Sequence, residues 1–344
     1  MSETKSRPSC QRGPSRKTKP SARIEVTRGM ADSTGTYRTC AVDVQRTFTF
    51  PPRRRRARHR RTHRRAPMPD AIINGVRIHY NEAGEGEPLL LIMGYGMPGE
   101  AWLGSLPFLG GFRAIYYDNR GTGQSDKPAG PYTVVQMADD AAGLLDQLDI
   151  ASAHVYGVSM GGMIAQELTL RHPEKVRSLV LGCTMCGGER STMCEPQVIE
   201  DLIAVVEGMG RMEPAAWVDR QLPLLFTAEW VEANPGIRDM LLMIAPMLPP
   251  TPPETAQHAM AGLWGWSSYD RLPQIEAPTL IVHGDRDVII PVDNARVLAE
   301  RIPGAHLHIV EGAGHGYPAQ DPVGVHQLVI DFFRERRQAA SQSR

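Results

Sequence analysis

Short apolar runs alternate along the chain with longer segments of helical periodicity. Apolar runs of about four to eight residues predict strands buried on both faces. We expect strands at 76–80, 89–93, 113–117, 154–158, 176–181, 279–282 and 306–310. The segments between them predict helices at 134–148, 160–170, 292–302 and 322–336. This alternation indicates βαβ units, and therefore an α/β fold with a mostly parallel sheet flanked by helices.

Residues 186–270 interrupt the alternation. They contain four of the five tryptophans and seven of the sixteen methionines, and their pattern is helical, broken at Pro246 and at 249–253. An insertion of this kind beside a parallel sheet predicts a helical lid. Met and Trp side chains suit an apolar, adaptable pocket, so we assign Trp264 and Trp266 to substrate binding. The alternative for any single one of them is the small core of the lid itself.

Charge divides the chain into two unequal parts. The 38 Lys and Arg balance the 38 Asp and Glu, but residues 1–67 contain 19 basic and 4 acidic residues, which leaves a net charge of −15 on the rest. This net negative charge argues against nucleic-acid binding by residues 68–344. Residues 1–67 lack apolar periodicity and cannot bury enough surface to offset the entropy of ordering. We therefore expect a disordered basic extension.

Three interpretations of residues 1–67 remain open. Clustered arginines, as at 53–56, could bind a nucleic acid or another anionic surface. An Arg- and Ser-rich segment that is poor in acids could also be a transit peptide. We favour the simplest interpretation, a non-functional extension ahead of Met68. The apolar runs of the body are too short to cross a bilayer, so we expect no membrane association.

The five cysteines are odd in number, and two of them lie in the basic extension. This usage does not fit a disulfide framework and predicts a reducing, cytoplasmic location. Cys183-x-x-Cys186 has no second pair at zinc-ligand spacing. We therefore interpret both as small buried thiols, and we expect no metal site.

The strongest chemical motif is Gly157-Val158-Ser159-Met160-Gly161, which matches G-x-S-x-G between an expected strand and an expected helix. In that context the serine lies on a tight, strained turn that exposes its hydroxyl above the sheet. The flanking glycines remove Cβ atoms that would clash at such a turn. The motif predicts that Ser159 is a nucleophile, and the alternative is an incidental serine in a glycine-rich turn.

A serine nucleophile needs a base, and in this architecture the order along the chain is Ser, acid, His. Two later strands are followed by a carboxylate and a histidine, at the sheet edge where such loops converge. We assign His315, flanked by glycines, as the base and Asp287 as the acid that orients it. Asp285 competes for the role of acid, but it lies nearer the strand end and could hold the loop by turn hydrogen bonds. We interpret His283 as structural.

Acyl transfer also requires hydrogen-bond donors for the developing oxyanion. One donor is expected to be the backbone N–H of Met160, which follows the nucleophile, and the other the backbone N–H of Tyr95 in the loop after the third strand. Gly94 and Gly96 allow the chain to turn on either side of Tyr95, and we include both in the binding site.

Together these motifs resemble the α/β-hydrolase superfamily, in its lidded branch of esterases, lactonases and haloperoxidase-like enzymes. The resemblance covers about residues 72–336 and includes the segment 117–126, which is similar to the D-x-R-G-x-G-x-S turn of the family. Many members carry His-Gly where this chain has Met93-Gly94, a substitution found among enol-lactonase-like and methylesterase-like members. Ser159 argues against the haloalkane dehalogenases and epoxide hydrolases, which carry Asp at that position.

The expected activity is hydrolysis of a small carboxylic ester or lactone through an acyl-enzyme, with no cofactor. The same triad could instead support perhydrolysis, carbon–carbon bond cleavage or acyl transfer, and a non-catalytic ligand receptor is a further alternative. The expected organisation is a basic extension, a first part of the core, a lid, a second part of the core and a disordered tail, at residues 1–67, 68–185, 186–270, 271–338 and 339–344.

Overall fold

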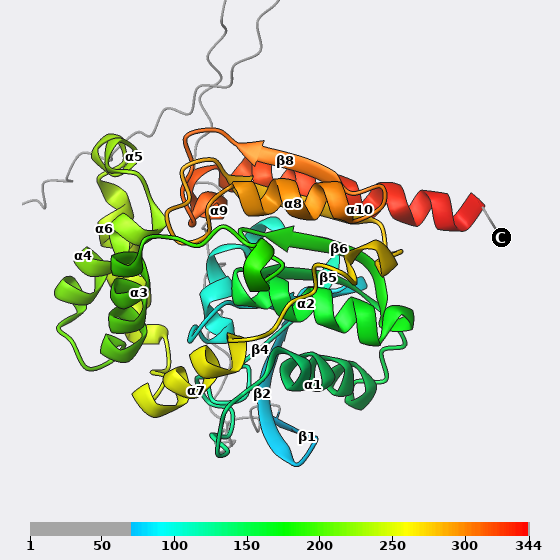
Figure 1. The fold of residues 1–344 in the computed structure, drawn as a ribbon, viewed down its shortest axis with the longest axis horizontal. Helices are drawn as coiled ribbons and strands as arrows, with labels where there is room; N and C mark the ends of the chain where they lie inside the picture. Colours follow the sequence, from blue (N-terminus) through cyan, green and yellow to red (C-terminus); the bar gives the residue numbers. More distant parts are fainter. Residues whose placement is uncertain (1–69, 343–344) are drawn as a thin grey trace, which may run out of the picture. The chain divides into compact units, whose positions relative to one another are not determined.

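A computed structural model describes residues 70–342 and, within that range, the side chains up to residue 335. The expectations for residues 1–67 fall outside the described residues. Eight strands form one sheet in the order β1-β2-β4-β3-β5-β6-β7-β8 (Figure 1). Their bounds are β1 Asp70–Ile73, β2 Val76–Ala83, β3 Glu87–Ile92, β4 Phe112–Tyr117, β5 Ala153–Val158, β6 Val176–Gly182, β7 Thr279–Gly284 and β8 His306–Val310.

The sheet is mostly parallel, as the strand and helix alternation predicts. Only β2 runs against its two neighbours, β1 and β4, and every pairing from β4 through β8 is parallel. Parallel neighbours bring the carboxyl ends of β3, β5, β6, β7 and β8 to one edge, where the loops that follow them meet. The short strand β1 was not predicted, because four residues at a sheet edge carry little pattern.

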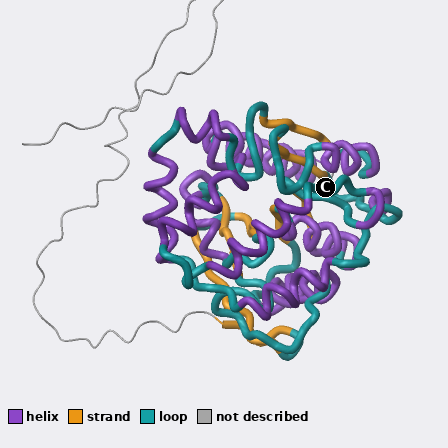
Figure 2. Tube along the Cα trace, turned by 60° about the vertical axis from the view of Figure 1, so that its left-hand side comes forward, coloured by secondary structure: helices purple, strands orange, loops and turns teal. Residues whose placement is uncertain are grey.

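Helices cover both faces of the sheet, and in Figure 2 they surround the strands. Alternate residues of each strand point to opposite faces. Leu90 and Ile92 pack with α1 and α2, whereas Leu89 and Leu91 pack with η2 and α10. These elements are α1 Val134–Gln147, α2 Met160–Arg171, α8 Asp293–Arg301, α9 Tyr317–Gln320, α10 Pro322–Gln342, η2 Gly99–Gly104, η3 Leu106–Phe108, η4 Pro173–Lys175 and η7 Leu272–Gln274.

The insertion between β6 and β7 is helical. Figure 1 shows α3 to α6 at the end of the sheet toward which the arrows of β6 and β8 point. The expected break at Pro246 falls just after the end of α6, and the expected break at 249–253 falls in the segment that leads into α7. The elements are η5 Gly188–Arg190, α3 Pro196–Gly208, α4 Pro214–Leu225, α5 Ala228–Ala233, α6 Gly236–Ile244, η6 Ala245–Met247 and α7 Pro253–Leu263.

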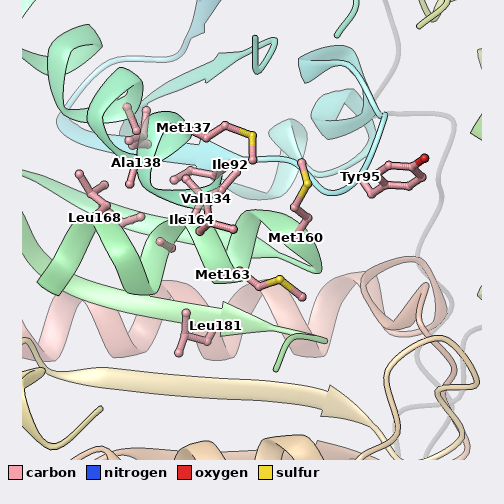
Figure 3. Packing of buried hydrophobic residues seen from close by; sticks show 14 of the residues in the cluster. Ile92, Tyr95, Val134, Met137, Ala138, Met160, Met163, Ile164, Leu168 and Leu181 are labelled. Carbon is pink, nitrogen blue, oxygen red and sulfur yellow. The ribbon is translucent and has the colours of Figure 1, made fainter. Parts of the chain in front are cut away.

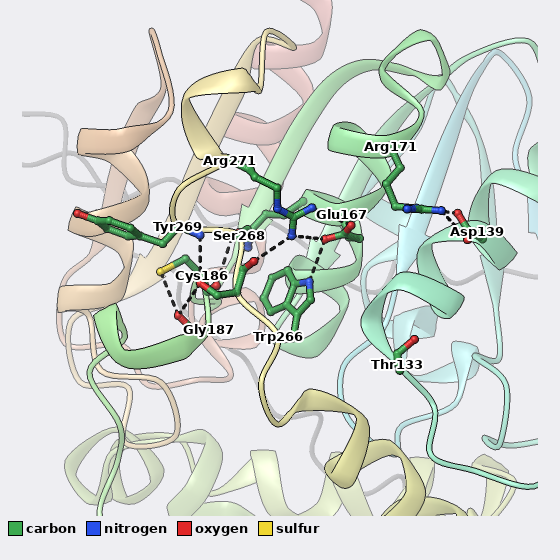
Figure 4. A network of polar contacts seen from close by, with 12 residues as sticks. Thr133, Asp139, Glu167, Arg171, Cys186, Gly187, Trp266, Ser268, Tyr269 and Arg271 are labelled. Carbon is green, nitrogen blue, oxygen red and sulfur yellow. Dashed lines mark hydrogen bonds and ion pairs between the residues drawn. The ribbon is translucent and has the colours of Figure 1, made fainter.

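One carboxylate of α2 connects this helix to the end of the insertion (Figure 4). Glu167 accepts hydrogen bonds from Trp266 Nε1 at 2.9 Å and from both terminal nitrogens of Arg271 at 2.9 and 2.8 Å. The backbone N–H of Ser268 donates to the carbonyl of Cys186 at 2.9 Å. The two ends of the insertion are therefore held side by side against α2.

The end of the chain differs from the expected disordered tail at 339–344. Helix α10 continues to Gln342, and residues 343–344 lie outside the described residues. Ala339 and Ala340 have high helix propensity, so the local sequence allows the helix to continue past residue 338. Among the described residues, no helix is both long enough and apolar enough to cross a membrane.

Candidate active site

The predicted nucleophile lies on a strained turn between β5 and α2. Ser159 has φ 57° and ψ −125°, a conformation that L residues rarely adopt. A Cβ on Gly157 would lie 2.2 Å from the carbonyl oxygen of Gly161, and a Cβ on Gly161 would lie 2.1 Å from that of Ile92. Both glycines are therefore required sterically, because each contact is with rigid backbone.

The loop after β3 lies directly against this turn. A Cβ on Gly94 would come within 2.9 Å of Ser159 Cβ and 3.3 Å of its Oγ. Gly96 has φ 65°, and a Cβ there would collide with Val206 of α3. Asn119 Nδ2 donates to the carbonyl of Met93 at 3.3 Å, which helps to hold the chain where it leaves β3.

The two predicted oxyanion donors lie at the same end of the packed core (Figure 3). Met160 is the first residue of α2, so its backbone N–H has no acceptor within the helix. Tyr95 follows Gly94 and is buried. Burial raises the pKa of the Tyr95 hydroxyl strongly, with a further contribution from Glu207, so the phenol remains protonated.

The predicted base and acid are in direct contact. Nδ1 of His315 lies 2.7 Å from Oδ2 of Asp287, and Oδ1 of Asp287 accepts the backbone N–H groups of Ile289 and Ile290, both at 2.9 Å. The side chain of Asp287 is completely buried. Asp285, the competing acid, instead accepts the backbone N–H of Gly312 at 2.7 Å and thereby ties together the loops after β7 and β8.

A second histidine contacts the same carboxylate. Nε2 of His283 lies 3.2 Å from Asp287 Oδ2 and 2.8 Å from the carbonyl oxygen of Ile290. A carbonyl oxygen only accepts, so Nε2 of His283 carries the proton. The sequence indicated a structural role for His283 but carried no sign of this contact with Asp287.

The pKa values of this group are strongly perturbed. Burial raises the pKa of Asp287, but the nearby His315 and His283 outweigh burial and hold it at about 2. Burial lowers the pKa of His315, but Asp287 and Cys183 outweigh burial and raise it well above 6.5. Such perturbation of neighbouring groups in a cavity is typical of functional sites.

Ser159 and His315 line the same cavity, which has a volume of about 440 Å³. Its wall is largely apolar. Side chains from the insertion form one side of the cavity. Residues from η2, η3, α9 and the loops that follow β3, β5, β6, β7 and β8 also line it. The contributing side chains from the insertion include Leu202, Val205, Val206, Trp217, Leu224, Phe226, Met240, Leu241, Ile244 and Leu248.

The two tryptophans that we assigned to binding do not line this cavity. Trp264 is 72% exposed, and Trp266 is buried at the far end of the insertion against Glu167. Composition did not reveal this, because it does not show which face of a helix meets the sheet. Trp217, which we did not single out, lines the cavity instead and donates from Nε1 to the carbonyl of Val205 at 2.8 Å. The helical periodicity of the apolar residues around Trp217 was the signal in the sequence that could have identified it.

The family's D-x-R-G-x-G-x-S segment has a structural role here. Asp118 is fully buried and accepts the backbone N–H groups of Gly99 at 2.7 Å and Gln124 at 2.6 Å. Arg120 forms a buried ion pair with Asp140. The bond from Gly99 to Asp118 holds the start of η2, which lines the cavity, and the Arg120–Asp140 pair holds the same segment to α1.

Comparison with known proteins agrees with this fold. A family model described as alpha/beta hydrolase fold matches residues 87–220, and one described as TAP-like protein matches residues 254–343. The protein "Putative carbamate hydrolase RutD" of Azorhizobium caulinodans is 30% identical over 78% of this chain and 99% of its own length. The 2-hydroxymuconate semialdehyde hydrolase of Pseudomonas putida is 30% identical over 77% and 94%.

A solved structure is similar as well. The enol-lactonase from Burkholderia xenovorans LB400 superposes with a TM-score of 0.66 and 29% identity, over 77% of this chain and all of that one. The chain belongs to the α/β-hydrolase family. Its fold class is the one predicted from the strand and helix alternation, and the relatives named here are enzymes.

Proposed function

We propose that this protein is a serine hydrolase of carboxylic esters or lactones, with Ser159 as nucleophile, His315 as base and Asp287 as the acid that orients the base. The observation that carries the proposal is that Ser159, on its strained turn, and His315 line the same apolar cavity. The His315 side chain is hydrogen-bonded to the buried carboxylate of Asp287. The similarity to an enol-lactonase over the whole of that chain supports this substrate class.

In the proposed mechanism, Ser159 Oγ attacks the carbonyl carbon while His315 takes the hydroxyl proton. Asp287 stabilises the imidazolium that forms, and its two backbone donors keep it charged and in place. The backbone N–H groups of Tyr95 and Met160 hold the oxyanion. His315 then protonates the leaving oxygen, and a water activated by the same ring releases the acyl group.

We propose that the insertion acts as a lid. Its helices supply most of the apolar wall of the cavity, and its carbonyl at Leu225 accepts the backbone N–H of Gly316 at 2.8 Å, next to the proposed base. Gly314 also packs on Leu225, where a Cβ would lie 2.6 Å from the carbonyl oxygen. A hydrophobic acyl or alcohol part of the substrate therefore suits the cavity.

The direct test is labelling with a fluorophosphonate, which forms a covalent adduct with an activated serine. We expect one adduct at Ser159, loss of labelling in Ser159→Ala, and loss of p-nitrophenyl ester turnover by at least about 10⁴-fold. Ser105→Ala is the matched control, because Ser105 lines the same cavity and should not affect labelling. Retained turnover in Ser159→Ala would contradict the proposal.

Carbon–carbon bond hydrolysis is the second candidate reaction. It is favoured by the 30% identity to a semialdehyde hydrolase over nearly all of that relative's length. Perhydrolysis and acyl transfer would use the same three residues. Product analysis on matched ester, lactone, carbamate and diketone substrates, with and without peroxide, separates these reactions. A cytoplasmic location stays a prediction from the cysteine usage, and cell fractionation tests it.

A further inference from the structure

A free thiol forms part of the cavity wall beside the proposed base. Cys183 follows the last residue of β6, is 3% exposed and lines the cavity together with Ser159 and His315. Its φ of 38° is disfavoured for a residue with a side chain, and its backbone N–H donates to the carbonyl of Val282 in β7 at 3.0 Å. The thiol is therefore held in place between the ends of β6 and β7.

The thiol belongs to a cluster of three metal-ligating side chains. Sγ of Cys183, one ring nitrogen of His315 and one carboxylate oxygen of Asp287 all lie within 4.8 Å of one another. Within residues 70–335, no other three such side chains gather so closely. Zinc holds sulfur at about 2.3 Å and nitrogen or oxygen at about 2.1 Å, so its ligand atoms lie about 3.5 Å apart. A shift of about 1 Å in these side chains would meet that geometry.

We propose that Cys183, His315 and Asp287 form an inhibitory binding site for a thiophilic divalent cation such as Zn²⁺. On binding, the thiol of Cys183 releases its proton, and the thiolate and the Asp287 carboxylate together balance the charge of the cation. His315 binds in its neutral form through the lone pair of its unprotonated ring nitrogen, and a charged ring first releases its proton to solvent. A ring fixed in this way cannot move protons to and from Ser159, so the cation blocks turnover.

The donor chemistry favours a soft cation over magnesium or calcium, because sulfur and imidazole ligands select zinc and its neighbours. The second cysteine of the C-x-x-C pair does not take part. Cys186 is buried three residues later, where its Sγ lies 3.5 Å from the hydroxyl of Ser191. The sequence predicted two small buried thiols and no metal site, and of the two only Cys183 lines the cavity.

The effect on turnover rests on the proposed function, but the binding does not, so two readouts separate them. In the first, ester turnover of the full chain is measured against Zn²⁺ concentration. We expect inhibition that a chelator reverses. Cys183→Ser should raise the inhibitory concentration at least about tenfold, relative to its own zinc-free activity, because a metal ligand is lost. Cys186→Ser is the matched control and should leave the inhibitory concentration unchanged.

The second readout needs no activity. Co²⁺ bound to a thiolate gives a sulfur-to-cobalt charge-transfer absorption. We expect this band in the wild type, in Ser159→Ala and in Cys186→Ser, and its loss in Cys183→Ser. In the wild-type protein alone, Zn²⁺ should also protect Cys183 from alkylation by iodoacetamide, as read by mass spectrometry. This measurement requires no variant to fold.

Two results would overturn the proposal. One is an unchanged cobalt band in Cys183→Ser, and the other is equal alkylation of Cys183 with and without Zn²⁺. A cobalt band that depends on Cys183 in a protein without esterase activity would instead support the site and contradict the proposed function.

Discussion

Nε2 of His283 lies 3.2 Å from Oδ2 of Asp287, the same oxygen that lies 2.7 Å from Nδ1 of His315. His283 is fully buried, and its Nε2–H group is shared between two acceptors, Asp287 Oδ2 and the carbonyl oxygen of Ile290. One carboxylate oxygen is therefore shared by two imidazole donors. Because each donor withdraws charge from that oxygen, His283 limits how strongly Asp287 holds the His315 proton.

Replacing His283 by Phe should therefore move the acid limb of the kcat/KM profile to higher pH. Asp287 loses one donor, becomes more basic and stabilises the imidazolium of His315 more strongly. We also expect kcat/KM at the optimum to fall about three- to tenfold, the value of one hydrogen bond. His283→Gln keeps an N–H at this distance and should restore the limb. An acid limb at the same pH in all three proteins would show that His283 only fills space.

The acid limb of the pH profile of the wild-type enzyme also has a predicted position. Only neutral His315 can accept the proton of Ser159, and its pKa is raised well above 6.5 by Asp287 and Cys183 despite burial. Activity should therefore be lost as the pH falls through a value above 6.5. Burial also raises the pKa of the Cys194 thiol, so this thiol remains neutral through this range. A limb at or below 6.5 in free enzyme would contradict this prediction.

Asp287→Asn and Asp285→Asn form a matched pair that tests which carboxylate is the acid. Asparagine at 287 offers an amide in place of the charge that His315 needs, so kcat should fall by at least about 10³-fold. Asparagine at 285 keeps an oxygen for the Gly312 N–H, so kcat should change by less than about tenfold. Steady-state kinetics on one p-nitrophenyl ester decides between them, and the reverse order would exchange the two roles.

Trp217→Ala should shift the acyl-chain preference toward longer substrates. Trp217 is 4% exposed and lines the cavity, so its removal enlarges the cavity. The variant should also lose about 3–5 kcal/mol of stability, because a large buried side chain is deleted. Trp264→Ala is the control, since Trp264 is 72% exposed and outside the cavity. An identical chain-length profile in both variants would show that Trp217 does not limit the substrate.

Glu167→Ala should destabilise the protein and loosen the end of the insertion. The change leaves Trp266 Nε1 and Arg271 without their acceptor. We expect a loss of about 1–3 kcal/mol, because Arg271 is partly exposed and its charge is screened. Asp139→Ala removes a comparable ion pair with Arg171 at the surface and should cost less than about 1 kcal/mol. Urea unfolding of the two variants makes the comparison, and equal losses would remove the special role of Glu167.

Much of the fold and part of the candidate site follow from local sequence alone. Apolar runs predict strands because each residue of a buried strand must be apolar regardless of its distant partners. The turn at Ser159 is readable for the same reason, since its glycines are required by backbone contacts within a few residues and with the adjacent strand. The preference for Asp287 over Asp285 as the acid rests on spacing within one loop and stays a prediction.

Tertiary structure alone decided which side chains of the insertion reach the cavity. Trp217 and Trp264 lie in one helical insertion, yet only the packing of the helices places the first inside and the second in solvent. The approach of Cys183 to Asp287 likewise joins the ends of two different strands, β6 and β7. Such contacts depend on strand order and on the register of neighbouring strands, and no periodicity along the chain encodes these.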